Sequence, residues 1–169
     1  MSKKQEAVKC VLVHAGLAAT GCGVFKAVVP VPLIEVGVLT MATKKMCKKL
    51  ANIYGYDGIA GVTTLIGVAV GAGFGGSLAT RIGDFIPGIN VAANVASTTI
   101  LHLTTGAIMI AAFELMKDGY IDPVSLTKSN SVSLVNELAV CATAMVGGVL
   151  RGGSLDEVVT SIKNKYLQA

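Results

Sequence analysis

The pattern of apolar and polar residues along this chain predicts a series of α-helices. The first is expected over residues 3–27, because Ser2 and Gln5 match the capping box that satisfies backbone donors at a helix start. Pro30 and Pro32 end it, since proline has no N–H donor and favours an extended conformation in the preceding residue. A new helix is therefore predicted directly after this proline pair.

This second helix, over residues 33–54, is amphipathic and basic. Its apolar residues recur at helical spacing: Leu39, Ala42, Met46, Leu50 and Ile53. Its lysines occupy other faces: Lys44, Lys45, Lys48 and Lys49. They also fall in the C-terminal turns, where positive charge complements the helix dipole. Gly55 is expected to cap the helix in a left-handed conformation.

Two uncharged stretches follow, and each is long enough to cross a membrane. The first covers residues 59–80, and the second covers residues 85–113 and ends at Glu114. Residues 81–88 between them combine charge with glycine and proline, as a tight connection between antiparallel helices requires. The pattern predicts a central helical hairpin of residues 59–80 and about 90–113.

The last third of the chain predicts a loop and two further helices. Residues 117–133 are polar and are interpreted as a loop outside the membrane. The apolar run of residues 138–150 is too short to span a membrane alone, so a packed or interfacial helix is expected, ending at Gly152 and Gly153. Residues 154–168 begin with a capping box and continue as an amphipathic helix.

The composition indicates that this all-helical chain is a membrane protein. The 169 residues fit a single domain. The chain is 53% hydrophobic and only 14% charged, whereas soluble domains carry about 25% charged residues. With 20 glycines and no tryptophan, its apolar surface comes from small and aliphatic side chains, which is typical of closely packed membrane helices.

The most specific motif is a small residue at every fourth position of the first uncharged stretch. These positions are Thr63, Gly67, Gly71, Gly75 and Ala79. They line one face of a helix and form a glycine zipper, which lets a second helix approach until the backbones touch. The expected partner is residues 90–113 or another copy of the chain. A buried hairpin in a soluble protein is the structural alternative.

The lysine cluster at residues 44–49 is interpreted as a contact for anionic lipid headgroups. A merely solvated face is the alternative. Nucleic acid is disfavoured, because base recognition would need arginines or aromatic residues among the lysines.

No catalytic, cofactor or metal site is predicted. The glycines match no phosphate-binding loop. His14 and His102 stand alone among apolar residues without further ligands at metal-binding spacing. The four cysteines lie far apart and are expected to be reduced, buried thiols rather than a disulfide framework. The chain is therefore not expected to be an enzyme.

Three short motifs carry a resemblance to a known family. They are residues 29–35 (VPVPLIE), 54–57 (YGYD) and 85–90 (FIPGIN). Together they resemble an uncharacterised bacterial membrane-domain family that occurs fused to, or encoded beside, small Era-like GTPases. The resemblance covers about residues 25–115. It implies an association with a GTPase and no chemistry, and this chain has no GTPase domain of its own.

The sequence thus predicts a membrane-embedded, self-associating helical protein that acts as an anchor, membrane-remodelling element or scaffold, with a small GTPase as a candidate partner. Lysines on both flanks of the hairpin favour two cytoplasmic termini. The alternative is a soluble homo-oligomeric scaffold or GTPase-binding module that buries the same apolar faces between subunits.

Overall fold

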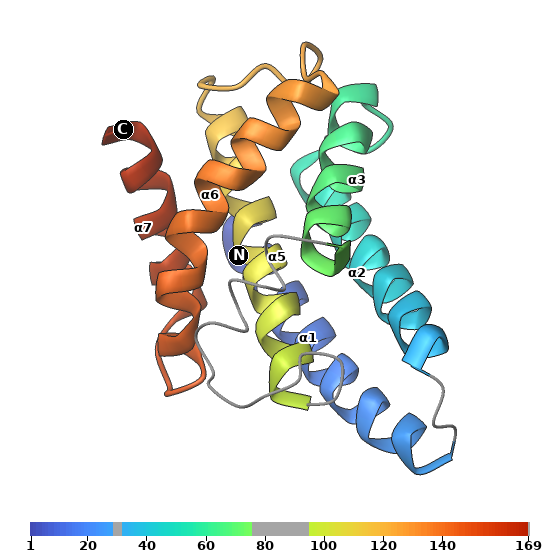
Figure 1. The fold of residues 1–169 in the computed structure, drawn as a ribbon. Coiled ribbons are helices and arrows are strands. Elements are labelled where there is room, and N and C mark those ends of the chain that lie inside the picture. The colour runs from blue at the N-terminus through green and yellow to red at the C-terminus, as the bar shows by residue number, and fades with distance from the viewer. Residues whose placement is uncertain (29–31, 76–94, 169) are drawn as a thin grey trace.

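The computed structural model describes the backbone of residues 1–28, 32–75 and 95–168, which fold into six α-helices (Figure 1). Side chains are described for residues 1–17, 37–72 and 98–168. The helices are α1 (Lys3–Val28), α2 (Pro32–Tyr54), α3 (Ala60–Gly75), α5 (Val95–Lys117), α6 (Lys128–Val149) and α7 (Leu155–Gln168). The all-helical prediction is confirmed.

Local backbone signals set the first helix boundaries as the sequence predicts. The amide of Ser2 donates to Gln5 Oε1 at 3.0 Å, and the amide of Gln5 donates to Ser2 Oγ at 3.2 Å, which completes the capping box. At the end of α2, Gly55 adopts a φ of +82°, and the amide of Tyr56 donates to the carbonyl of Ala51 at 2.8 Å. This bond closes α2 with the expected left-handed cap.

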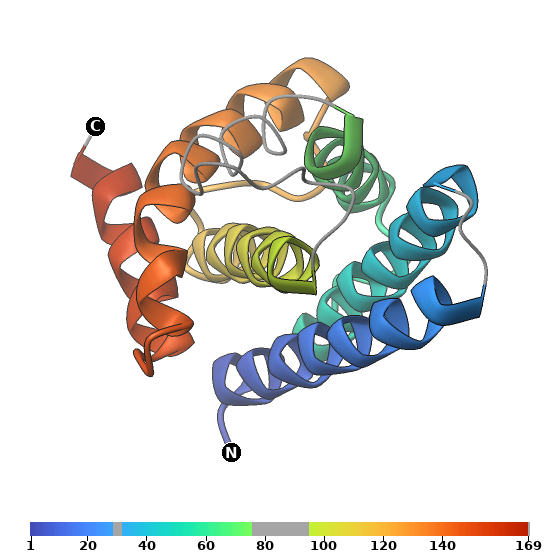
Figure 2. The same cartoon turned by 60° about the horizontal axis from the view of Figure 1, so that its bottom comes forward.

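Helix α5 is the centre of the bundle. Each of the other five helices is close to it in Figure 2, and α1 packs against it most extensively. Its segment Thr98–Lys117 is 89% buried inside the chain. Where α1 crosses it, Gly106 lies against Val11, and a Cβ added at Gly106 would meet a methyl of Val11 at 2.5 Å. The glycine therefore allows the two backbones to approach closely.

The two helices of the predicted hairpin are antiparallel neighbours (Figure 1). Helix α3 covers the described part of the first uncharged stretch, and α5 covers the second. The predicted connection at residues 81–88 lies outside the described residues. The main packing partner of α5 is α1, so the hairpin is one element of a larger bundle.

The prediction of a polar loop over residues 117–133 is wrong at its C-terminal end. Helix α5 continues to Lys117, and α6 already begins at Lys128. Thr127 accounts for the early start, because its hydroxyl accepts a hydrogen bond from the amide of Asn130 at 3.2 Å and caps the helix. The polar residues after Thr127 form the first turn of α6. Because this helix has 22 residues, it is also not too short to span a membrane.

The C-terminal amphipathic helix is confirmed as α7. Leu155, Val158, Val159 and Ile162 are its buried residues. Gly152, with a φ of +95°, separates it from α6 as the sequence predicts. Lys4 ties α7 to the start of α1, because its ammonium lies 2.9 Å from Asp156 Oδ1 and donates to the hydroxyl of Thr160.

Candidate membrane-facing surface and groove

The four lysines of α2 form an exposed basic band. Lys44, Lys45, Lys48 and Lys49 are all exposed, whereas the residues between and beside them point into the core: Thr43, Met46, Cys47 and Leu50. Ion pairs within the described residues involve other lysines. Four positive charges on one stripe without an internal counter-charge favour contact with an anionic surface.

Two hydrogen bonds bring the start of α1 and the ends of α2 and α5 together. The ammonium of Lys3 donates to the carbonyl of Tyr54 at 3.0 Å, which joins the start of α1 to the end of α2. The hydroxyl of Tyr54 donates to Glu114 Oε1 at 2.6 Å, which joins the end of α2 to the end of α5. Burial and this carboxylate raise the pKa of Tyr54, so its proton stays on the phenol.

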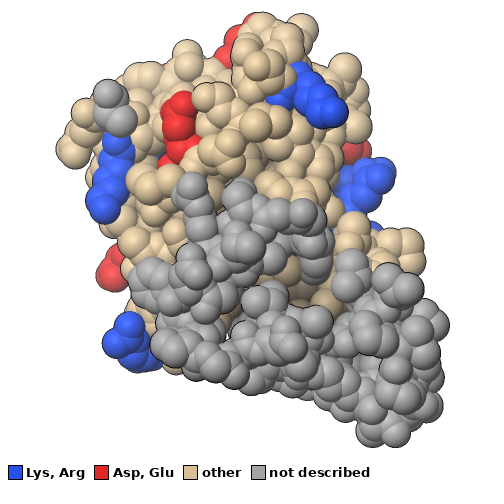
Figure 3. Space-filling model, in the orientation of Figure 1, with Lys and Arg blue, Asp and Glu red and all other residues tan. Residues whose placement is uncertain are grey.

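The same end of the bundle also receives α7 and Lys117. Lys117 pairs with Glu114 at 3.1 Å, and Lys163 of α7 pairs with Asp118. The hydrogen bond from Lys163 lowers the pKa of Asp118 below its ordinary value. We call this region, where the start of α1 meets the ends of α2 and α5, the charged end. In Figure 3 charged side chains stand mainly at the margins of the visible face.

The other halves of these helices carry no formal charge where their side chains are described. Residues 10–17, 37–43, 58–72 and 98–113 contain no Asp, Glu, Lys or Arg. Several large apolar side chains there are nevertheless exposed: Leu12, Val13 and Leu17 on α1, and Val38 and Met41 on α2. Leu17 is 64% exposed and Met41 62%. Exposed apolar groups beside an uncharged region are a feature of protein and membrane contacts.

Two helices of the described chain are long and apolar enough to cross a membrane. They are Thr98–Lys117 in α5 and Lys128–Val149 in α6. The first is almost completely enclosed by its neighbours, whereas only 33% of the second is buried. The central helix of a soluble protein can be as long and as apolar as α5, so length and hydropathy alone do not place α5 in a membrane. Val132 and Val140 are exposed on α6, but polar residues such as Ser133, Asn136 and Glu137 are exposed on the same helix.

The predicted zipper residues lie on the outer side of α3. Thr63, Gly67 and Gly71 are exposed, and a Cβ added at Gly67 or Gly71 would meet no described atom within 4 Å. Gly75 is the last residue of α3, and Ala79 lies outside the described residues. The core contacts of α3 come instead from its larger side chains: Val62, Leu65, Ile66, Ala69 and Val70. Pairing of this face with another copy stays a prediction.

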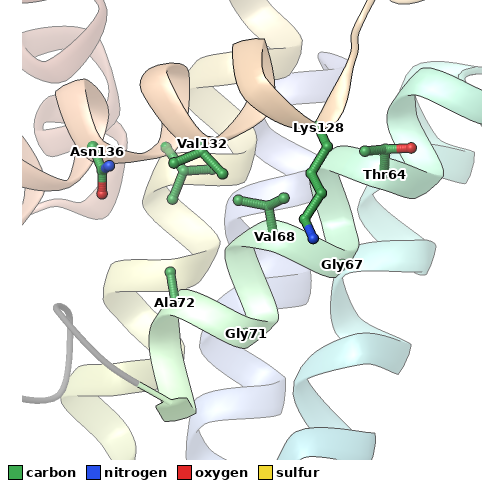
Figure 4. A pocket seen from close by; sticks show the side chains of 9 residues that line it. Thr64, Gly67, Val68, Gly71, Ala72, Lys128, Val132 and Asn136 are labelled. Carbon is green, nitrogen blue, oxygen red and sulfur yellow. The ribbon is translucent and has the colours of Figure 1, made fainter.

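The two described zipper glycines line a groove between α3 and the first half of α6 (Figure 4). Its volume is about 550 Å³. Its apolar lining includes Val68, Ala72, Val132 and Val135, and its polar residues are Thr64, Lys128 and Asn136. Sequence reasoning missed this groove, because Lys128 was assigned to a loop. The N-cap residue Thr127 was the sequence signal that would have placed Lys128 in the first turn of a helix.

The histidines have protein partners rather than metal-binding neighbours. Fully buried His102 lies 3.1 Å from the hydroxyl of Thr43 through Nε2 and 3.0 Å from the carbonyl of Thr98 through Nδ1. His14 Nδ1 lies 2.8 Å from the carbonyl of Cys10. Within the described part of the chain, no three His, Cys, Asp or Glu residues gather as metal ligands.

Comparisons with known proteins identify no relative. No family model, no curated protein and no solved structure matches the chain. The resemblance to the GTPase-associated membrane family therefore stays a prediction.

The cysteines provide a first test of the packing between α1 and α2. Cys10 and Cys47 are buried, Cys141 is half-buried, and all three are free thiols. Burial raises the pKa of Cys47 to about 12. We expect maleimide at pH 8 to label only Cys141 in the folded Cys22→Ser variant, because thiolate and access are both required. Mass spectrometry should show one adduct, against three in urea, and rapid labelling of Cys47 would contradict this packing.

Proposed function

We propose that the protein is a membrane-embedded helical anchor or scaffold that holds the uncharged part of its bundle in the bilayer. The observation that carries this proposal is the separation of charge along α1, α2, α3 and α5. Lysines and carboxylates gather at one end of these helices, and the described remainder has none. Charged groups are costly in hydrocarbon and favourable among headgroups, so this arrangement suits a bilayer.

The lysine band supplies the headgroup contact in this proposal. It lies in the last turns of α2, next to the charged end and beyond the exposed apolar residues Val38 and Met41. Lysines near an anionic surface each contribute about 1 kcal/mol, and buried apolar side chains add to this attraction.

The proposed orientation, with both termini cytoplasmic, is supported by a contact near the N-terminus. The ion pair between Lys4 and Asp156 joins the N-terminal turn to α7, on the side of the charged end. With the lysines on the cytoplasmic side, both ends of the described chain are cytoplasmic, in agreement with the positive-inside rule. Self-association, membrane remodelling and a GTPase partner stay predictions, and the last rests on the family resemblance alone.

A soluble homo-oligomer is the second candidate, and the burial of α5 favours it. A central helix that is enclosed by five neighbours needs no lipid around it. In this alternative, the exposed faces of α1, α2 and α6 are covered by other subunits.

Fractionation separates the two candidates. We expect the expressed protein to stay in the membrane pellet after a carbonate wash. A monodisperse oligomer in detergent-free size-exclusion chromatography, with nothing in the washed pellet, would refute the membrane proposal and support the soluble scaffold.

The lysine band has its own test. We expect the Lys44→Gln/Lys48→Gln variant to bind phosphatidylglycerol-containing vesicles about 30-fold more weakly in a flotation assay, because two headgroup contacts of about 1 kcal/mol each are lost. The Arg151→Gln/Lys165→Gln variant removes the same net charge from exposed positions elsewhere and should bind nearly as the unmodified protein does. Equal losses in both variants would show that only net charge matters.

A further inference from the structure

The groove beside α3 has a lysine near one end and small or aliphatic residues along the rest. Figure 4 shows the Lys128 side chain reaching over Val68 toward Gly67, while Gly71 and Ala72 lie further along α3. The Lys128 end is near the charged end, because the start of α3 packs against the segment before α6, where Gly61 faces Leu126. The groove therefore runs from a cation near the charged end toward the uncharged part of the bundle.

The groove is open because glycine forms part of its floor. Neither Gly67 nor Gly71 carries a side chain, and the space above each is free of described atoms. The walls are aliphatic, from Val68, Val132 and Val135. A volume of about 550 Å³ falls within the range of small-molecule sites and suits an unbranched apolar chain.

The cation at its mouth selects an anionic occupant. Lys128 is exposed, and the ion pairs of the described residues do not include it. It also lies in the first turn of α6, where the helix dipole adds positive potential. No carboxylate lines the groove among the described residues, so an anionic occupant would give Lys128 a counter-charge there.

We propose that this groove binds one acyl chain of an anionic phospholipid, with the phosphate beside Lys128. The acyl chain lies along Gly67 and Gly71 between the valines and points away from the charged end. This inference deepens the proposed membrane function by naming a lipid class and a site. The direction of the groove matches the direction in which the bundle is proposed to enter the bilayer.

A second copy of the chain fits the groove less well. Helix α3 has no charged residue from Ala60 to Gly75, so an α3 face packed into the groove would cover the Lys128 ammonium without offering a carboxylate. Burial of an unpaired charge opposes such an interface.

Native mass spectrometry in a nonionic detergent tests the site and reports the oligomeric state at once. The protein is mixed with equal amounts of dioleoylphosphatidylglycerol and dioleoylphosphatidylcholine. We expect one retained lipid per chain, with phosphatidylglycerol favoured about fivefold, as one lysine beside an anionic headgroup predicts. The Lys128→Gln variant should lose this preference, whereas Lys165→Gln, at an exposed position on α7, should keep it.

The Gly71→Leu variant fills the groove without disturbing the fold, because no described atom lies within 4 Å of the added Cβ. We expect it to lose the retained lipid, whereas Gly16→Leu, at an equally open site on α1, should keep it. Lipid retention by Gly71→Leu would overturn the proposal. So would a dimer that Gly71→Leu converts to a monomer with lipid binding unchanged, because the occupant would then be a second copy. Carbonate extraction of the unmodified protein tests the membrane function separately, so the two proposals can fail independently.

Discussion

Replacing Gly106 with valine is expected to lower the free energy of unfolding by about 3 kcal/mol, because the new side chain overpacks the crossing of α1 and α5. Its Cβ alone would lie 2.5 and 2.6 Å from the two γ-carbons of Val11. Val11 is fully buried and β-branched, so within α1 it has essentially one rotamer and cannot turn its methyls away. The backbone of one helix must move instead.

Urea unfolding followed by circular dichroism measures this effect against a matched control. The Gly67→Val variant makes the same chemical change at an exposed helical site, where the added Cβ meets no described atom within 4 Å, and we expect a change within about 0.5 kcal/mol. Adding Val11→Ala to Gly106→Val should recover part of the lost stability, since it removes the γ-carbons that clash. Equal stability of the Gly106 and Gly67 variants would contradict the close approach of α1 to α5.

The Tyr54→Phe variant is expected to lose about 1.5–3 kcal/mol, the range for a hydrogen bond to a charged group. Glu114 is only 6% exposed, and the Tyr54 hydroxyl donates to its Oε1 at 2.6 Å. Removing this donor leaves the buried carboxylate with Lys117 as its described partner. The ring itself still packs on Phe113, so packing is preserved.

Tyr56→Phe is the control for this change. Tyr56 also contacts Phe113, with ring centroids 5.8 Å apart, yet its hydroxyl forms no described hydrogen bond. We expect a loss below about 0.5 kcal/mol there. Urea or thermal unfolding of both variants under identical conditions measures the two losses of unfolding free energy. Similar losses would mean that the Tyr54 hydroxyl adds nothing beyond its ring.

Helix boundaries were predictable from sequence where the signals are local. The capping box at Ser2 and Gln5, Pro32 at the first position of α2 and the left-handed Gly55 act within one helical turn, so their effect does not depend on distant residues. The exposed lysine band follows from the same kind of periodicity. Thr127 shows the limit, because its cap was overlooked among the polar residues that surround it.

The role of the zipper glycines was not predictable, because α3 offers two apolar faces. One carries Gly67 and Gly71, and the other carries larger side chains such as Leu65 and Ile66. Within this bundle the larger side chains face the core, since they remove more apolar area from water. The glycines remain outside and line the groove. Only the tertiary structure adds Lys128, which comes from a helix far away in sequence.

The sequence by itself determined the all-helical class, most helix ends, and the division of the chain into basic and uncharged segments. The tertiary structure decided that α5 is the central helix, that α1 is its closest neighbour, and that the groove lies between α3 and α6. The physical reason is that caps and periodicity depend on neighbours within a turn or two. The polar residues of α5 are not gathered on one face, so its sequence favours no particular side for packing, and its partners follow from how the six described helices together bury the most apolar surface.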